Sequence, residues 1–320
     1  MRLQRNLIII TILFSLAGSL RAQQLPYYSQ FPNYPLSYNP AFTGIKKNID
    51  VMMDYRNQWV GFEGAPVTQG FYLDSRMLKG KMGLAGSVVS DETGPYKRIS
   101  YGISAAYHIH FPDVELSMGA QGSMDKIFWD ARLASVHNSG DPAVDRQITD
   151  YKWVPNAAFG ILLFNDRFHI GISMLNLIEN HASYYKGDTS HKAIVTIVPN
   201  YYFTVGYNFS ENPDFVWQNS LVAMVATGSP LNIEYNIKLN MKKVFFVGLD
   251  FRLKDAIAAM VGIQFLGKAQ VGYSYDFVTM PFSTYQKGTH EITLAYRTNL
   301  EPDNKYRHNN DFIHQRYFLF

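Results

Sequence analysis

The chain has 320 residues and a formal net charge of +3, with 17% charged and 15% aromatic residues, including 22 tyrosines. So weak and dispersed a positive charge does not indicate a nucleic-acid partner. The absence of cysteine excludes disulfides, thiolate metal sites and cysteine nucleophiles.

The first 22 residues have the three parts of a secretory signal peptide. Residues 1–6 carry two arginines, residues 7–16 are almost continuously apolar, and residues 17–22 are rich in small side chains. The apolar run is about ten residues long, whereas a helix needs roughly 20 to span a bilayer. We therefore predict export, with cleavage after Ala22. Residues 23–48 are predicted to form a periplasmic or plug-like segment, and the Tyr, Pro and Gln content of residues 23–40 suits an extended chain.

Residues 231–242 alternate between apolar and polar side chains without interruption. The odd positions are Leu231, Ile233, Tyr235, Ile237, Leu239 and Met241, and the even positions are Asn232, Glu234, Asn236, Lys238, Asn240 and Lys242. This period of two predicts a strand with one apolar and one polar face. Large aliphatic side chains opposite amides and charges are typical of a transmembrane β-barrel, which has lipid outside and water or polar side chains inside.

The same alternation recurs along the chain between turn signals. It predicts strands over residues 49–56, 67–76, 82–91, 101–111, 114–124, 153–164, 168–176, 199–209, 214–227, 231–242, 244–252, 256–265, 269–277 and 288–297. The predicted fold is therefore all-β, a transmembrane antiparallel barrel of about 14 strands over residues 49–298, in the cell outer membrane. Tyrosine girdles at the two membrane interfaces would account for the aromatic content.

The connections between the predicted strands are of two lengths. Residues 112–113 and 267–268 predict tight hairpin turns, whereas residues 129–152 and 180–192 lack strand periodicity and predict loops outside the membrane. Short periplasmic turns with longer extracellular loops are the usual arrangement of outer-membrane barrels. Residues 299–320 are either a final strand with an aromatic end or a periplasmic tail, and the polar stretch 301–310 favours the tail.

Two segments carry motifs that go beyond a general barrel. Residues 39–44 read NPAFTG, residues 55–59 read YRNQW, residues 61–68 read GFEGAPVT, and Asp74 follows. Residues 288–296 read GTHEITLAY. In this combination and order, the chain resembles the PorP/SprF family of type IX secretion system membrane proteins of the Bacteroidetes. The usual serine of the late motif is replaced by Thr289.

The resemblance implies a role in export and surface display without enzymatic activity. It implies an outer-membrane barrel in contact with membrane lipid, the type IX translocon and periplasmic proteins of the secretion or gliding machinery, and for some members one large secreted adhesin. We expect the protein to dock such cargo to the machinery. A porin-like channel for small solutes is the alternative, because the predicted inward residues Asn232, Glu234, Asn236 and Lys238 are polar.

The motif residues are the candidate partner-binding set. Arg56, Asn57, Gln58 and Trp59 combine bidentate donors, amides and a large aromatic side chain, as protein interfaces favour. An equally weighted alternative places Tyr55 and Trp59 in an aromatic girdle and Arg56 in a polar lumen. The full set is Asn39, Pro40, Phe42, Thr43, Gly44, Arg56, Asn57, Gln58, Trp59, Gly61, Gly64, Pro66, Asp74, His290 and Glu291.

Catalytic and metal chemistry have little support in the sequence. His108 and His110 lie two apart on one strand face, a spacing that can hold a metal, but no third ligand of clear spacing accompanies them. Serine elbows, phosphate-binding glycine loops and paired-carboxylate motifs are absent. We expect no enzymatic activity and no cofactor.

Overall fold

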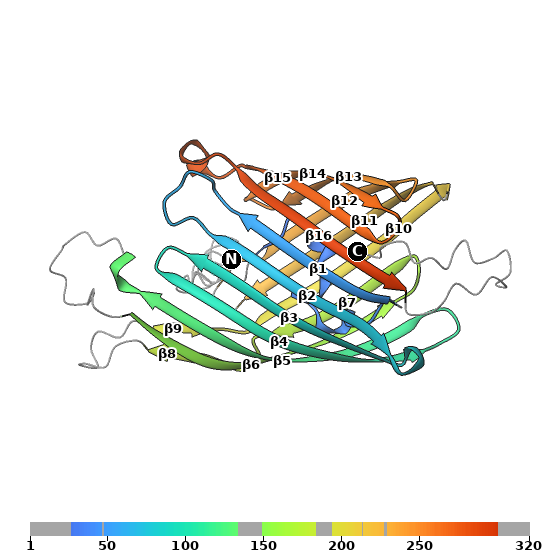
Figure 1. Cartoon of the computed structure of the whole chain (residues 1–320), viewed down its shortest axis with the longest axis horizontal. Coiled ribbons are helices and arrows are strands. Elements are labelled where there is room, and N and C mark those ends of the chain that lie inside the picture. The colour runs from blue at the N-terminus through green and yellow to red at the C-terminus, as the bar shows by residue number, and fades with distance from the viewer. Residues whose placement is uncertain are drawn as a thin grey trace, which may run out of the picture.

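The protein is a closed antiparallel β-barrel in the computed structural model, which describes residues 27–46, 48–133, 149–183, 194–212, 214–226 and 229–299 (Figure 1). Each barrel strand pairs with its neighbours in the chain, and the first strand pairs with the last. The barrel strands are β1 (Asn48–Asn57), β2 (Val67–Met77), β3 (Met82–Thr93), β4 (Tyr96–His110), β5 (Glu115–Asp130), β6 (Thr149–Phe164), β7 (Phe168–Leu175), β10 (Asn200–Asn212), β11 (Phe215–Ala226), β12 (Asn232–Met241), β13 (Phe245–Arg252), β14 (Ala256–Phe265), β15 (Ala269–Val278) and β16 (Thr289–Asn299).

These fourteen strands confirm the predicted fold and overlap the predicted ranges one for one. The main differences lie near the predicted loop 129–152. Strand β4 begins at Tyr96, β5 continues to Asp130 and β6 begins at Thr149, so the strands reach further than predicted. Charged side chains at these ends, such as the ion pair between Arg98 Nη2 and Asp125 Oδ2 at 2.7 Å, interrupt the apolar alternation on which the prediction depended.

A second difference lies between β7 and β10. Strands β8 (Asn180–Ser183) and β9 (Ile194–Ile197) pair as a separate two-stranded sheet, where residues 180–192 were predicted to form a loop without strands. Strands of four residues are too short to show a period of two in the sequence.

The barrel is apolar on its outside and polar on its inside. The outward face of β4 shows the pattern, with exposed Tyr101, Ile103 and Tyr107 alternating with buried Ser104 and His108. In β12, Glu234, Asn236 and Lys238 are buried, as the alternation in residues 231–242 predicted. An apolar exterior around a polar interior is the arrangement that a bilayer requires of a barrel.

The longest connections are all at one end of the barrel. They join β1 to β2, β5 to β6, β7 to β10, and β15 to β16, and the opposite end has turns of at most four residues. By the usual asymmetry of outer-membrane barrels, we assign the long-loop end to the cell exterior and the short-turn end to the periplasm.

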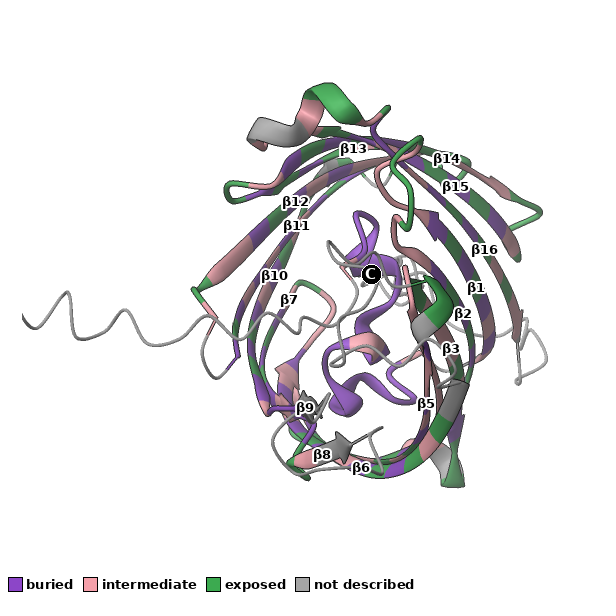
Figure 2. Ribbon diagram, turned by 90° about the vertical axis from the view of Figure 1, so that its left-hand side faces the viewer, coloured by how far each residue is buried: buried purple, intermediate pink, exposed green. Residues whose placement is uncertain are grey.

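Residues 27–46 lie inside the barrel and are called the plug here (Figure 2). The plug folds into three short turns, η1 (Phe31–Asn33), η2 (Pro35–Ser37) and η3 (Pro40–Phe42), and not into the extended chain that its composition suggested. Each turn has a proline in its first two positions, where the fixed φ of proline suits a helical turn and its missing N–H costs nothing.

Three further 3₁₀ turns lie outside the plug. Turns η4 (Leu78–Gly80) and η5 (Ala131–Leu133) follow β2 and β5, and η6 (Pro281–Tyr285) precedes β16. No helix within the described ranges is long and apolar enough to span a bilayer.

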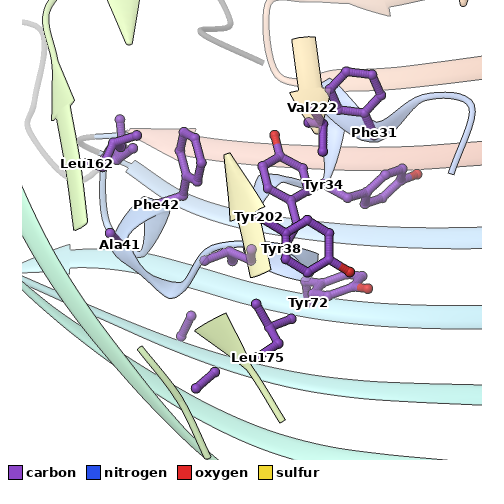
Figure 3. Packing of buried hydrophobic residues seen from close by; sticks show 14 of the residues in the cluster. Phe31, Tyr34, Tyr38, Ala41, Phe42, Tyr72, Leu162, Leu175, Tyr202 and Val222 are labelled. Carbon is purple, nitrogen blue, oxygen red and sulfur yellow. The ribbon is translucent and has the colours of Figure 1, made fainter. Parts of the chain in front are cut away.

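The largest hydrophobic core of the described residues lies between the plug and the barrel wall, as Figure 3 shows. Tyr38 of the plug packs against three rings of this core, with centroid distances of 6.0 Å to Phe31, 5.6 Å to Phe42 and 6.4 Å to Tyr202 of β10. Tyr34 packs in the same way against Tyr72 of β2 at 5.9 Å. Edge-on and tilted contacts of this kind add to the free energy of burial. The plug therefore packs against the wall as the core of a soluble domain would.

Candidate functional site

A buried ionic cluster holds the start of the plug. The side chain of Ser29 lies between two arginines, and its hydroxyl donates to Asp276 Oδ1 at 2.6 Å while accepting from Arg56 Nη1 and Arg252 Nη2, each at 2.8 Å. Arg56 also donates from Nη1 to Glu291 Oε2 and from Nη2 to Asp276 Oδ2, both at 2.7 Å. Hydrogen bonds to charged groups are stronger than those between neutral groups, and the Ser29 hydroxyl forms three of them.

The plug backbone is held by the same cluster. The carboxylate of Glu291 accepts the backbone N–H of Ser29 at 2.8 Å and that of Gln30 at 3.0 Å. On β12, Lys238 Nζ donates to Asn33 Oδ1 at 3.1 Å. Since a buried amide without an acceptor is costly, these contacts fix the position of the first plug turn.

The cluster continues around the wall through Arg252. Its Nε lies 3.2 Å from Glu234 Oε1, and its Nη1 lies 2.7 Å from Asp255 Oδ2 in the turn between β13 and β14. Arg252 and Asp276 were not among the sequence candidates. Both are charged residues at inward strand positions, and this pattern is the signal that could have identified them. Their contact with each other depends on the register of β13, β14 and β15, which the sequence does not give.

The second anchor of the plug is Asn39. Its side-chain oxygen accepts the backbone N–H of Ala41 at 2.8 Å, which caps the η3 turn. Its amide nitrogen donates to the backbone carbonyls of Ile161 at 3.4 Å and Ile172 at 3.3 Å, in β6 and β7. Asn39 therefore both starts the turn and attaches it to two strands of the wall.

The η3 turn lies on a row of small residues that crosses five strands. The row is defined by direct register partners in β3 to β7, namely Gly83, Ala106, Gly119, Gly160 and Ser173. A Cβ atom would come within 2.2 Å of Thr43 O at Gly83, 2.3 Å of Pro40 O at Gly119 and 2.0 Å of Asn39 Oδ1 at Gly160. Side chains at these positions would displace the plug, so the small-residue row is the surface on which the NPAFTG segment packs.

The end of the plug is held by β2. Gly44 has φ +68°, which favours glycine, and a Cβ there would come within 2.4 Å of Gly83 Cα. The backbone N–H of Gly44 donates to Asp74 Oδ1 at 2.7 Å. Lys46 Nζ lies 3.0 Å from Asp50 Oδ2, and although that carboxylate favours the charged ammonium, burial lowers the pKa of Lys46.

The outer mouth carries the other part of the motif, in the connection from β1 to β2. This connection is joined to the one before β16, because Val60 N donates to Gly288 O at 2.9 Å and Lys287 N donates to Val60 O at 2.7 Å. Gly94 N of the β3–β4 turn donates to Gly64 O at 3.0 Å. The two loops and the turn therefore form one connected platform, on which Phe62 and Tyr285 are exposed.

The structure divides the sequence candidates into three groups. Asn39, Pro40, Phe42, Thr43, Gly44, Arg56, Asp74 and Glu291 lie at the interface of the plug with the wall. Asn57, Gln58, Trp59, Gly61, Gly64 and Pro66 lie at the end of β1 and in the mouth loop. His290 is on the outer side of β16, where its Nδ1 is 2.7 Å from the Tyr273 hydroxyl.

The histidine pair on β4 lies in two different environments. His108 is buried against the ring of Phe164, whereas His110 is exposed and its Nε2 lies 3.1 Å from Arg76 Nη2. Over the described ranges, no group of three His, Asp or Glu side chains is arranged to hold a metal ion.

Comparison with known proteins identifies a family and a fold. Residues 20–296 match the family described as type IX secretion system membrane protein PorP/SprF. No curated protein matches the chain. Among solved structures, the CymD monoaromatic hydrocarbon channel has a TM-score of 0.51 at 12% identity, with 82% of this chain and 92% of CymD covered. At this identity the likeness concerns the barrel fold alone.

Two further barrels have similar coverage. A FadL homologue of Pseudomonas aeruginosa has a TM-score of 0.48 at 11% identity, covering 89% of this chain and 96% of that one. The toluene transporter TodX of Pseudomonas putida has a TM-score of 0.46 at 9% identity, covering 84% and 94%.

Proposed function

Because the chain belongs to the PorP/SprF family of type IX secretion system membrane proteins, we propose that this outer-membrane barrel is a docking component of that system. In this role it holds secreted cargo, such as a large surface adhesin, near the translocon. It also links that cargo to periplasmic proteins of the secretion or gliding machinery. The barrel works as a binding scaffold, without enzymatic activity.

The observation that carries this proposal is the packed plug. Its residues are buried from Tyr28 to Leu36 and from Tyr38 to Ile45, apart from a partly exposed Ser37, and they are held by an ionic cluster at one end and the small-residue row at the other. A segment held by this many buried contacts supports a scaffold in which the plug stays inside the barrel. It also gives the wall a rigid interior, which favours precise presentation of the loops at either end.

The mouth platform supports contact with a partner outside the cell. Backbone hydrogen bonds join its two loops and the β3–β4 turn, so the exposed rings of Phe62 and Tyr285 are held on a connected frame. Exposed aromatic side chains on such a frame are typical of interaction surfaces, since little conformational entropy is lost when they are buried.

Export through residues 1–22 as a signal peptide is part of the proposal. These residues lie outside the described ranges, as does the segment 300–320, for which a periplasmic tail remains our prediction.

Affinity purification tests the docking role. The tagged full-length protein is extracted from its native outer membrane in mild detergent, and co-purifying proteins are identified by mass spectrometry. We expect translocon components, a periplasmic machinery protein or one very large surface protein. Recovery of the barrel alone, under conditions that preserve other outer-membrane complexes, would contradict docking.

The alternative, a channel for small solutes, is tested by conductance in planar bilayers. The packed plug leads us to expect no steady current from the wild-type protein. A steady current would favour the channel, and the plug would then have to leave the lumen or rearrange within it.

A further inference from the structure

A cavity lies in the outer half of the lumen, between the plug and strands β2 to β7. Its volume is about 100 Å³ and it is partly open to solvent, so it can enclose one end of a larger ligand. Its lining includes Ala85, Ser104, Gln121, Ala158 and Leu175, each two positions outward from a member of the small-residue row. The cavity therefore lies directly above the plug, which blocks its periplasmic side.

The walls of the cavity carry hydrogen-bonding side chains that the protein itself does not use. Within the described ranges, no side-chain hydrogen bond is formed by the hydroxyls of Ser87, Ser100, Ser104 and Ser123 or by the amide of Gln121. Hydroxyls and amides both donate and accept, so this set complements a ligand that also does both.

The charges at the cavity are largely compensated. Arg98 is paired with Asp125 at 2.7 Å, and Asp91, the other charged residue of the lining, accepts a hydrogen bond from Thr68 at 2.7 Å. These three groups carry a formal charge of −1 together, which disfavours phosphorylated or carboxylated ligands.

Apolar side chains lie among these polar groups in the lining. Leu36 of the plug, Ala85, Ala158 and Leu175 contribute aliphatic surface, and Tyr28 and Tyr72 place two hydroxyls 3.4 Å apart. An uncharged ligand with an apolar face and many hydroxyls matches a lining of both kinds.

The strand ladders distinguish between two uncharged ligand classes. Strands β3, β4 and β5 are each paired with a neighbouring strand on both sides, so this part of the wall offers side-chain groups almost alone. An extended peptide brings a donor and an acceptor at every residue and binds best to a free strand edge, which these three strands lack. A sugar needs no such edge.

From these observations we propose that the cavity is a binding site for one end of a neutral oligosaccharide. The ligand enters from the outer mouth and rests on the plug, with its hydroxyls against the serines and Gln121. The proposal does not depend on docking of cargo, because it concerns a direct property of the purified barrel.

Isothermal titration calorimetry on the purified full-length protein tests the proposal. The detergent is lauryldimethylamine oxide, which has no sugar headgroup. The probes are maltotriose, cellotriose, mannotriose and triacetylchitotriose, together with a neutral peptide of Gly, Ser and Ala. Each sugar is tested in two forms, free and coupled through its reducing end to albumin. Binding of either form supports the proposal. Binding of the free form indicates a free sugar as the natural ligand, and binding of the coupled form alone indicates a glycan attached to a protein.

Three variants give the matched comparison. Gln121→Leu removes an amide at similar volume, and Ser104→Trp fills the cavity, so each should weaken sugar binding by about tenfold or more. Ala105→Trp, the adjacent residue on the lipid-facing side of β4, should leave binding unchanged. Each variant is used only if its heat-modifiable folded band is retained, and Gln121→Leu keeps the test valid if Ser104→Trp does not fold.

Absence of binding by all four sugars at millimolar concentration would overturn the proposal. Binding of the peptide in preference to every sugar would also overturn it, as would sugar binding that Gln121→Leu leaves intact. A failed purification of secretion partners would have no bearing on these titrations, so the two proposals fail separately.

Discussion

Arg56 and Glu291 are direct register partners in β1 and β16, and their side chains form a 2.7 Å ion pair inside the barrel. This pair lies on the seam where the first and last barrel strands close the sheet. Glu291 also accepts two backbone N–H groups of the plug. One carboxylate thus links closure of the barrel to filling of its lumen.

The first prediction concerns this carboxylate. Glu291→Ala leaves Arg56 with fewer partners and two plug amides without an acceptor, so we expect a loss of about 3–5 kcal/mol in the free energy of unfolding. Glu92→Ala breaks the exposed Glu92–Lys97 pair and should cost only about 0–1 kcal/mol. Urea unfolding in lipid vesicles, followed by the heat-modifiable gel band, measures both. Equal losses in the two variants would mean that the cluster is not holding the barrel.

The second prediction concerns the small-residue row. Gly119→Ala places a methyl group within 2.3 Å of Pro40 O, so the plug must shift, at a cost of about 1–3 kcal/mol. Gly122→Ala, on the same strand, meets nothing within 4 Å and is the matched control. Trypsin cleavage after Lys46 should be faster in Gly119→Ala than in the control. Identical cleavage rates would show that the plug tolerates the methyl group without moving.

The third prediction concerns the mouth platform and depends on the docking role. Phe62→Glu replaces an exposed ring with a charge, so recovery of co-purifying secretion partners should fall by about tenfold or more, as for a hot-spot residue. Leu133→Glu, an exposed residue after β5 and outside the motif, should leave recovery unchanged. Quantitative mass spectrometry of the purified complexes compares the two. Equal recovery would place the partner surface elsewhere.

The fourth prediction concerns the lipid-facing surface. Ile103 is 69% exposed at the middle of β4, so Ile103→Arg should cost about 2–4 kcal/mol near the bilayer midplane. Phe111→Arg, at the turn after β4, should cost about 0–1 kcal/mol because it lies near the interface. Unfolding from lipid vesicles gives both values. A small loss for Ile103→Arg would indicate that this part of β4 does not face lipid.

The strand pattern could be predicted from the sequence because each strand carries its own alternation. In residues 231–242 the period of two identifies both the strand and its inward face before any partner strand is known. The strand ends near Tyr96 and Asp130 could not be predicted, since charged and aromatic residues there no longer alternate with apolar ones.

The arrangement of the candidate site depends on register and closure, which a single sequence does not determine. The motifs identified Arg56 and Glu291, but their meeting with Ser29, Asp276 and Arg252 follows from the pairing of β13 to β16 with β1. In the same way, Gly83, Gly119 and Gly160 are unremarkable alone and form a surface only when β3 to β6 align. The alternation within one strand identifies its inward face, but it does not determine which residues lie beside one another several strands apart.

The location of the Arg56–Glu291 pair has a consequence for assembly. A sheet that closed around an empty lumen would keep the ion pairs of Arg56, Arg252 and Glu291 within the wall, but it would lose their hydrogen bonds to Ser29 and to the plug amides. Zippering of the last strand onto the first is therefore most favourable when residues from before the first strand are already enclosed. We therefore expect closure of the barrel and enclosure of the plug to be coupled steps of assembly.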